Sequence, residues 1–169
     1  MANSAGICTS FKVELMTGHH ALGTTVTRGG TGADALKMAL YLTTATVTPA
    51  TTTFSATNEV SSANYTSGGA SVTNGTAPTS SGTTAYWTPS ASVSWTTVTF
   101  TTDCAFLYND TQGDRAIAVF TFSSQTVTAG TFTLTMPTND SSNALIRMVD
   151  SGALADLADS ISLPRFRAA

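Results

Sequence analysis

The chain has 169 residues, enough for one domain with a sizeable core. Only 10% of them are charged, against about 25% in ordinary soluble proteins, and Thr and Ser take the polar positions instead. The net charge of −3 and the lack of a Lys/Arg cluster argue against a nucleic-acid partner, and no apolar run approaches the roughly 20 residues that a membrane-spanning helix needs.

The first residues lack the basic and apolar segments of a secretory signal, so we expect synthesis in a cytoplasm. Ser10–Gly18 is expected to form a short helix, capped by Ser10 and stopped by Gly18, with Phe11 and Leu15 on one face. His19 and His20 follow without an acidic or Cys residue at metal-ligand spacing, so a structural role is favoured over a metal site. Gly23–Gly32 has loop composition and matches no phosphate-binding pattern.

Two strands are predicted in the first half of the chain, Ala35–Thr43 and Ala70–Thr73. Thr44–Thr57 is expected to be an edge strand or an extended surface segment. Asn74–Thr84 is rich in Gly, Ser, Thr and Pro and is predicted to be a mobile loop. The aromatic residues Tyr86, Trp87 and Trp95 follow, and core closure or a subunit contact is a more common role for such a group than stacking on a ligand.

The middle of the chain carries the strongest strand pattern. Phe132, Leu134 and Met136 alternate with Thr residues, which predicts a strand with one buried face, and Ala116–Phe122 is apolar at nearly every position, as in a strand covered on both faces. We expect a continuous antiparallel meander of four strands, Val93–Thr102, Ala105–Tyr108, Ala116–Phe122 and Thr131–Met136, with turn residues Asn109–Asp114 in its centre. The predicted fold is all-β, an antiparallel β-sandwich resembling a jelly roll, with short N- and C-terminal helices.

The last part of the chain differs in character. Ala144–Val149 is predicted to be the final strand, and Ser151–Leu163 a short helix that Pro164 prevents from continuing. Arg165-Phe166-Arg167 then forms either a frayed end or an arm that docks on another chain. We therefore divide the chain into a β-sandwich domain, residues 1–149, and a C-terminal helix and arm, residues 150–169.

No constellation of titratable residues indicates catalysis, and we expect no enzyme, no cofactor and no metal site. Asp110 and Asp114 share a loop but lack the spacing of a calcium-binding loop. Cys8 and Cys104 lie far apart in the sequence, and in a reducing cytoplasm two free thiols are favoured over a disulfide.

Several segments occur in a specific order: Phe11-Lys12-x-Glu14-Leu15-x-x-Gly18-x-His20, Lys37-x-Ala39-Leu40-Tyr41, Asn58-Glu59-Val60 and Tyr65-x-x-Gly68-Gly69. Further matching segments are Val93–Thr96, Leu107–Thr111, Ala116–Phe122 and Gly130–Leu134. Together they resemble a family of small virion proteins of tailed bacteriophages, over most of the chain up to Val149. The resemblance implies a β-sandwich subunit of the particle, such as a capsid cement or decoration protein, and it identifies no binding residues.

The function we expect is therefore a non-enzymatic virion protein that braces neighbouring capsomers. Its partners would be the major capsid protein or other virion proteins, and the charge-poor surface favours a homo-oligomer. Two alternatives remain: a neck, tail or tail-tip subunit, and a carbohydrate-binding module of a host-attachment structure. The candidate subunit contacts are Trp87, Trp95, Leu154, Leu157, Ile161 and Phe166.

Overall fold

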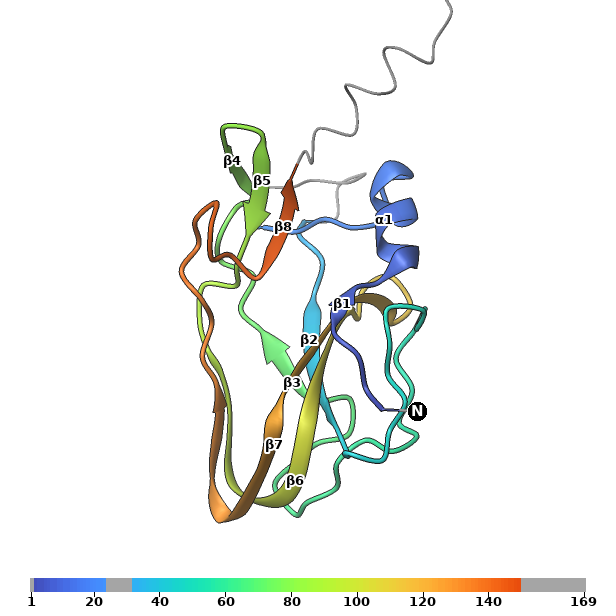
Figure 1. Cartoon of the computed structure of the whole chain (residues 1–169), viewed down its shortest axis with the longest axis vertical. Coiled ribbons are helices and arrows are strands. Elements are labelled where there is room, and N and C mark those ends of the chain that lie inside the picture. The colour runs from blue at the N-terminus through green and yellow to red at the C-terminus, as the bar shows by residue number, and fades with distance from the viewer. Residues whose placement is uncertain (1, 24–31, 150–169) are drawn as a thin grey trace, which may run out of the picture.

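A computed structural model describes residues 2–23 and 32–149 and contains two antiparallel sheets and one helix in these ranges. The larger sheet has the strand order β1-β7-β6-β2-β3, and the smaller one β4-β5-β8 (Figure 1). The prediction of an all-β fold is confirmed. The elements are β1 (Gly6–Ile7), α1 (Thr9–Met16), β2 (Leu36–Tyr41), β3 (Ala70–Val72), β4 (Thr79–Ser81), β5 (Thr84–Trp87), β6 (Val93–Asn109), β7 (Arg115–Leu134) and β8 (Ile146–Val149).

The four predicted strands between Val93 and Met136 are two long strands instead. β6 and β7 pair from Val93↔Leu134 at one end to Asn109↔Arg115 at the other, so the expected four-strand meander is wrong and the structure has one long hairpin. The residues left between the predicted strands, Asp103–Cys104 and Ser123–Gly130, lie within β6 and β7. Thr and Ser are common in turns but fit the exposed face of a strand equally well. The composition of these segments therefore did not distinguish a turn from a continuing strand.

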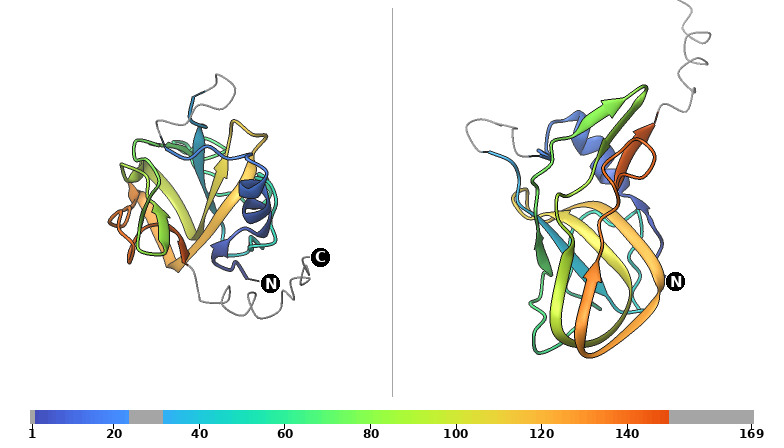
Figure 2. Two further views of the ribbon diagram at one scale, coloured as in Figure 1. Left: turned by 90° about the horizontal axis from the view of Figure 1, so that it is seen from above. Right: turned by 90° about the vertical axis from the view of Figure 1, so that its left-hand side faces the viewer.

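The hairpin bends sharply along its length, and the register of its pairing shifts at several points between Trp95 and Cys104 (Figures 1 and 2). Thr97 and Ala129, one on each strand, have φ angles of 54° and 48°, in the left-handed region. Such irregularities increase the local twist and let a strand change direction. The two halves of the hairpin, one on each side of the bend, thereby face a common interior (Figure 2).

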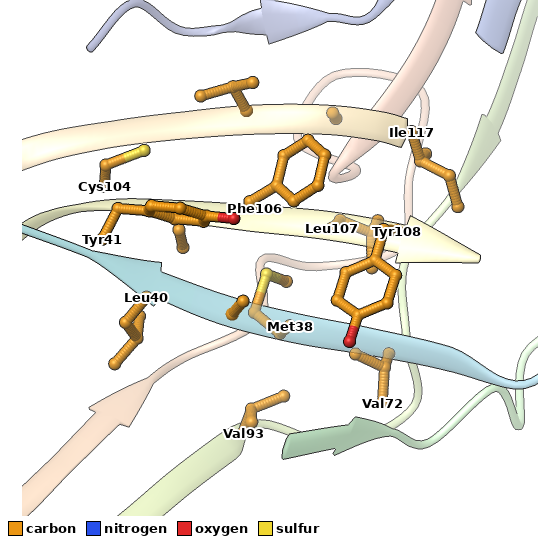
Figure 3. Packing of buried hydrophobic residues seen from close by; sticks show 14 of the residues in the cluster. Met38, Leu40, Tyr41, Val72, Val93, Cys104, Phe106, Leu107, Tyr108 and Ile117 are labelled. Atoms are coloured by element: carbon orange, nitrogen blue, oxygen red, sulfur yellow. The ribbon is translucent and has the colours of Figure 1, made fainter. Parts of the chain in front are cut away.

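The interior is lined by side chains from β2, β6 and β7 (Figure 3). Ala116–Val119 is fully buried, which confirms that this part of β7 is covered on both faces. Near the bend, Trp95, Phe100 and Phe132 have ring centroids 5.6–6.2 Å from one another or from Tyr65. Aromatic contacts of this kind hold the two halves of the bent hairpin together by burying a large apolar area.

A buried carboxylate fixes the turn before β3. Glu59 Oε1 accepts hydrogen bonds from the Tyr65 hydroxyl at 2.8 Å and the Gly68 N–H at 2.8 Å, and Oε2 accepts one from the Ser67 hydroxyl at 2.7 Å. Gly69 has a φ of +77°, and a Cβ there would lie 1.9 Å from the Met38 carbonyl oxygen. The turn therefore packs directly on the β2 backbone.

The remaining predicted elements agree with the structure in type more than in boundary. The strands predicted at Ala35–Thr43 and Ala70–Thr73 correspond to β2 and β3. The loop predicted at Asn74–Thr84 is wrong in part, because it contains β4, which pairs with β5 through a turn at Gly82. The final strand begins at Ile146.

The N-terminal helix is present, but Ser10 does not cap it. α1 begins at Thr9, its N-cap is Cys8, and no side chain caps its first turn. Gly18, with a φ of +72°, follows its end. In residues 2–23 and 32–149 there is no helix long and apolar enough to span a membrane. Most of the Gly23–Gly32 loop and the C-terminal segment, with its predicted Ser151–Leu163 helix, lie outside the described residues.

Candidate functional site

Several titratable side chains of the described residues meet beside the helix α1. Glu14, from α1, receives two charge-assisted hydrogen bonds: Arg115 Nη1 of β7 contacts Oε1, and His20 Nε2 lies 2.7 Å from Oε2. The His20 side chain is fully buried and that of Glu14 is 11% exposed. The helix is thereby tied to the larger sheet through a carboxylate with both oxygens engaged.

The far side of the His20 ring identifies its protonation state. Asn109 Nδ2 lies 3.0 Å from Nδ1 of the ring. Since the Asn109 carbonyl oxygen accepts the N–H of Gln112, its amide nitrogen must be the donor toward His20. Nδ1 is then an acceptor, and Nε2 carries the proton that it donates to Glu14. His20 is therefore a neutral imidazole in this structure.

The pKa values of the pair follow from this geometry. Burial lowers the pKa of His20 below its ordinary value, outweighing the hydrogen bond to Glu14 and the charge of that residue. Burial alone would raise the pKa of Glu14, but the hydrogen bonds from His20 and Arg115 and the positive charge of Arg115 lower it overall. The arrangement thus holds an ionised carboxylate beside a neutral imidazole.

A second buried carboxylate extends the cluster. Asp34 Oδ2 accepts hydrogen bonds from Asn109 Nδ2 and from the Ala21 N–H, both at 2.7 Å, and its Oδ1 accepts one from Gln112 Nε2 at 3.2 Å. Asp34 is 5% exposed and Asn109 is fully buried. We call the set of Glu14, His20, Asp34, Asn109 and Arg115 the polar cluster.

The polar cluster is built to hold elements together. Each His20 ring nitrogen has a protein partner, so neither is available to take a proton from a substrate without breaking that contact. No group of three or more His, Cys, Asp or Glu side chains in residues 2–23 and 32–149 is arranged to hold a metal ion. What the cluster does is fix α1, the residues around His20 and Asp34, and the β6–β7 turn relative to one another.

Helix α1, held in this way, forms one wall of an apolar groove. The groove has a volume of about 570 Å³ and lies between α1 and the strand β8. Ile7, Phe11, Leu15 and Met16 line one side, Met148 and Val149 the other, and the cations Lys12 and Arg147 also line it. Met16 is 81% exposed, Met148 50% and Val149 56%. Large apolar side chains with this exposure, gathered in one place, are characteristic of binding surfaces.

Phe11 connects the groove to the polar cluster. Its ring is 1% exposed and meets the His20 ring edge-on, with centroids 4.7 Å apart. The same side chain lines the groove. Within Phe11–His20, Phe11 and Leu15 therefore face the groove, and Glu14 and His20 anchor the helix behind it.

The two Trp residues predicted as subunit contacts lie inside the chain. Trp87 is 1% exposed and donates its indole N–H to the Thr76 carbonyl at 2.8 Å, and Trp95 is 5% exposed between Tyr65 and Phe132. Buried rings offer no surface to a second protein, so this placement corresponds to core closure, the other role that the sequence left open. Leu154, Leu157, Ile161 and Phe166 lie outside the described residues.

The two thiols are buried and free. Burial raises the pKa of Cys8 to about 11 and that of Cys104 to about 12, so both are protonated at neutral pH. A thiol in this state is a poor nucleophile.

Sequence reasoning did not find the polar cluster or the groove. The cluster joins positions 14, 20, 34, 109 and 115, which only the fold brings together, and the groove has one wall from each end of the described chain. The isolated acidic residues in apolar surroundings, Glu14 and Asp34, were the available signal, because a buried carboxylate needs partners. No family model, no curated protein and no solved structure matches this chain.

Proposed function

We propose that the chain is a non-enzymatic structural subunit of a bacteriophage particle, a capsid decoration protein that binds the outside of the capsid lattice and braces neighbouring capsomers. The observation that carries the proposal is the α1–β8 groove, an exposed apolar surface of the kind that protein contacts cover. The resemblance of the segments up to Val149 to virion proteins is the reason for assigning the subunit to a phage particle. Such a protein acts by contact alone.

The proposal accounts for the low content of charge. Only 10% of the residues are charged, and a surface so poor in charge does little to keep free copies apart. In a lattice each copy needs to contribute only a weak contact, because many copies bound at once multiply their effect through effective concentration. The partners in this proposal are the major capsid protein and further copies of this chain.

The architecture that goes with this proposal is a jelly-roll-like β-sandwich. The bend of the β6–β7 hairpin supports this architecture, because each half of the bent hairpin turns one face toward a shared interior (Figure 2). In a sandwich the two inner faces form a single core. Phe100 and Phe132, which lie on opposite sides of the left-handed residues Thr97 and Ala129, make such a contact across the bend.

The neck or tail alternative uses the same contacts in a ring of few copies. The copy number in purified particles separates the two, measured by quantitative mass spectrometry against the major capsid protein. A decoration protein is expected at a ratio near that of the capsid protein. A small fixed number of copies per particle would overturn the decoration role. The sugar-binding alternative needs exposed Trp rings, and the burial of Trp87 and Trp95 weighs against it.

A further inference from the structure

We propose that the α1–β8 groove binds the C-terminal segment of a second copy of this chain. The occupant is the stretch 153–163, docked as an amphipathic helix with Leu154, Leu157 and Ile161 on the apolar floor. This inference deepens the proposed function, because it rests on the assembly of copies side by side. It names the surface and the segment through which copies join.

The spacing of the apolar residues fits a helix lying in a groove. Leu154, Leu157 and Ile161 stand at positions i, i+3 and i+7, the spacing of the anchor residues by which amphipathic helices occupy hydrophobic grooves. The groove volume of about 570 Å³ is within the range of roughly 300–1,000 Å³ typical of binding pockets. It can therefore take several aliphatic side chains at once.

The charges of the two surfaces are complementary. The charged residues that line the groove are Lys12 and Arg147, both cationic. Between Val149 and Pro164 the charged residues are Asp150, Asp156 and Asp159, all acidic. Among the described residues, Arg147 makes a long hydrogen bond, 3.5 Å, to the Ser141 carbonyl and interacts with the charge of Asp140. Carboxylates beside the apolar stripe would give both cations partners.

The course of the chain favours a second copy over the chain's own segment. β8 points away from the larger sheet, and Val149, at its end, is itself part of the groove wall (Figure 1). For Leu154 of the same copy to enter, the backbone would have to reverse within Asp150–Ala153 and return along its own strand. A segment from a neighbouring copy enters without this reversal, and the exchange joins each copy to the next.

Disulfide trapping in the full-length chain tests the inference. A Met16→Cys chain is mixed with a Leu157→Cys chain and oxidised, and the disulfide-linked heterodimer is measured on a non-reducing gel. We expect most of the monomer band to be lost to this heterodimer. The matched control is Val13→Cys, on the same helix and 53% exposed but outside the groove lining, which should leave the monomer band. Cys8 and Cys104 are buried and protonated and should stay unlinked.

Three results would overturn the inference. These are equal linkage of Met16→Cys and Val13→Cys, the absence of any linkage, and a Met16→Cys/Leu157→Cys double variant that closes within one molecule at the expense of the heterodimer. A Lys12→Glu change should lower the yield of the heterodimer, and an unchanged yield would contradict the proposed contact between Lys12 and the acidic segment. The purified chain suffices for these measurements, so a failure here is distinct from a copy number that contradicts the capsid role.

Discussion

At the scale of single residues, Gly69 makes the most restrictive contact described. A Cβ at this position would lie 1.9 Å from the Met38 carbonyl oxygen and 2.5 Å from its carbon, and the backbone also has a positive φ. The atoms that it meets belong to the backbone of β2, which cannot rotate away as a flexible side chain could. The turn that Glu59 holds is therefore fixed on two sides.

We predict that Gly69→Ala lowers the free energy of unfolding by more than about 4 kcal/mol, because strand β2 must shift to admit the methyl group. The control is Gly113→Ala, where φ is +71° but no atom lies within 4 Å of the added Cβ. That change should cost only the left-handed backbone strain, about 1–2 kcal/mol. Urea unfolding of both variants measures the difference, and equal losses would contradict the steric account.

His20 and Glu14 make stability depend on pH. Because the pKa of His20 is lowered in the folded chain, the unfolded chain binds the proton first as the pH falls below about 6.5, and stability decreases. The pKa of Glu14 is also lowered, so its contribution is present above its ordinary value of 4.5 and is lost as the pH falls through its folded value. Both groups therefore lower the stability of the fold as the pH falls.

We therefore expect the urea midpoint to fall from pH 7 to pH 4. His20→Gln should flatten the upper part of this dependence, between pH 7 and pH 5, and leave the lower part, because Gln keeps a donor for Glu14 without a titrating ring. The variant should also lose about 1–3 kcal/mol, since the Asn109 amide loses a buried partner. An unchanged slope between pH 7 and pH 5 would contradict the assignment of a buried neutral imidazole.

At the scale of elements, the bent β6–β7 hairpin organises the fold. Its two left-handed residues, Thr97 and Ala129, are not glycines, although this backbone conformation costs an L-residue about 1–2 kcal/mol. The curvature is therefore maintained against local strain by the aromatic contacts inside the bend, such as Phe100 on Phe132.

We predict that Ala129→Gly raises the free energy of unfolding by about 0.5–1 kcal/mol, because relief of the left-handed strain exceeds the entropy cost of glycine. Ala118→Gly, in the regular buried part of the same strand, is the control and should lower stability by at least about 0.5–1 kcal/mol. Thermal or urea unfolding of the pair tests this. A loss of stability in both variants would show that the bend is not strained at Ala129.

The sequence predicted elements better than their connections. Periodicity identified the buried stretch Ala116–Val119 and the strand β2 because apolar patterns report burial directly. It divided β6 and β7 because Thr and Ser are equally compatible with turns and with exposed strand positions. The cluster around His20 depends on contacts between residues as far apart as Glu14 and Arg115, and the groove beside α1 on residues as far apart as Ile7 and Val149. No local pattern encodes such pairs.

At the scale of the whole molecule, the buried apolar side chains of residues 2–23 and 32–149 form one core, which joins β2, β6 and β7 to Cys8 and Phe11. We predict that a chain truncated after Val149 still unfolds in a single cooperative urea transition at a midpoint close to that of the full chain. It should lose self-association, measured by sedimentation velocity over a range of concentrations. A truncated chain that fails to fold would contradict the division between domain and arm.

We propose that this protein acts by surface contact on a capsid lattice, and its location in a cryo-electron microscopy map of the particle tests this proposal most directly. We expect density repeated over the outer capsid surface, with the α1–β8 groove of each copy covered by a segment of its neighbour. Density confined to the portal vertex or the tail would contradict the decoration role, and a groove facing solvent in every copy would contradict the contact assigned to it.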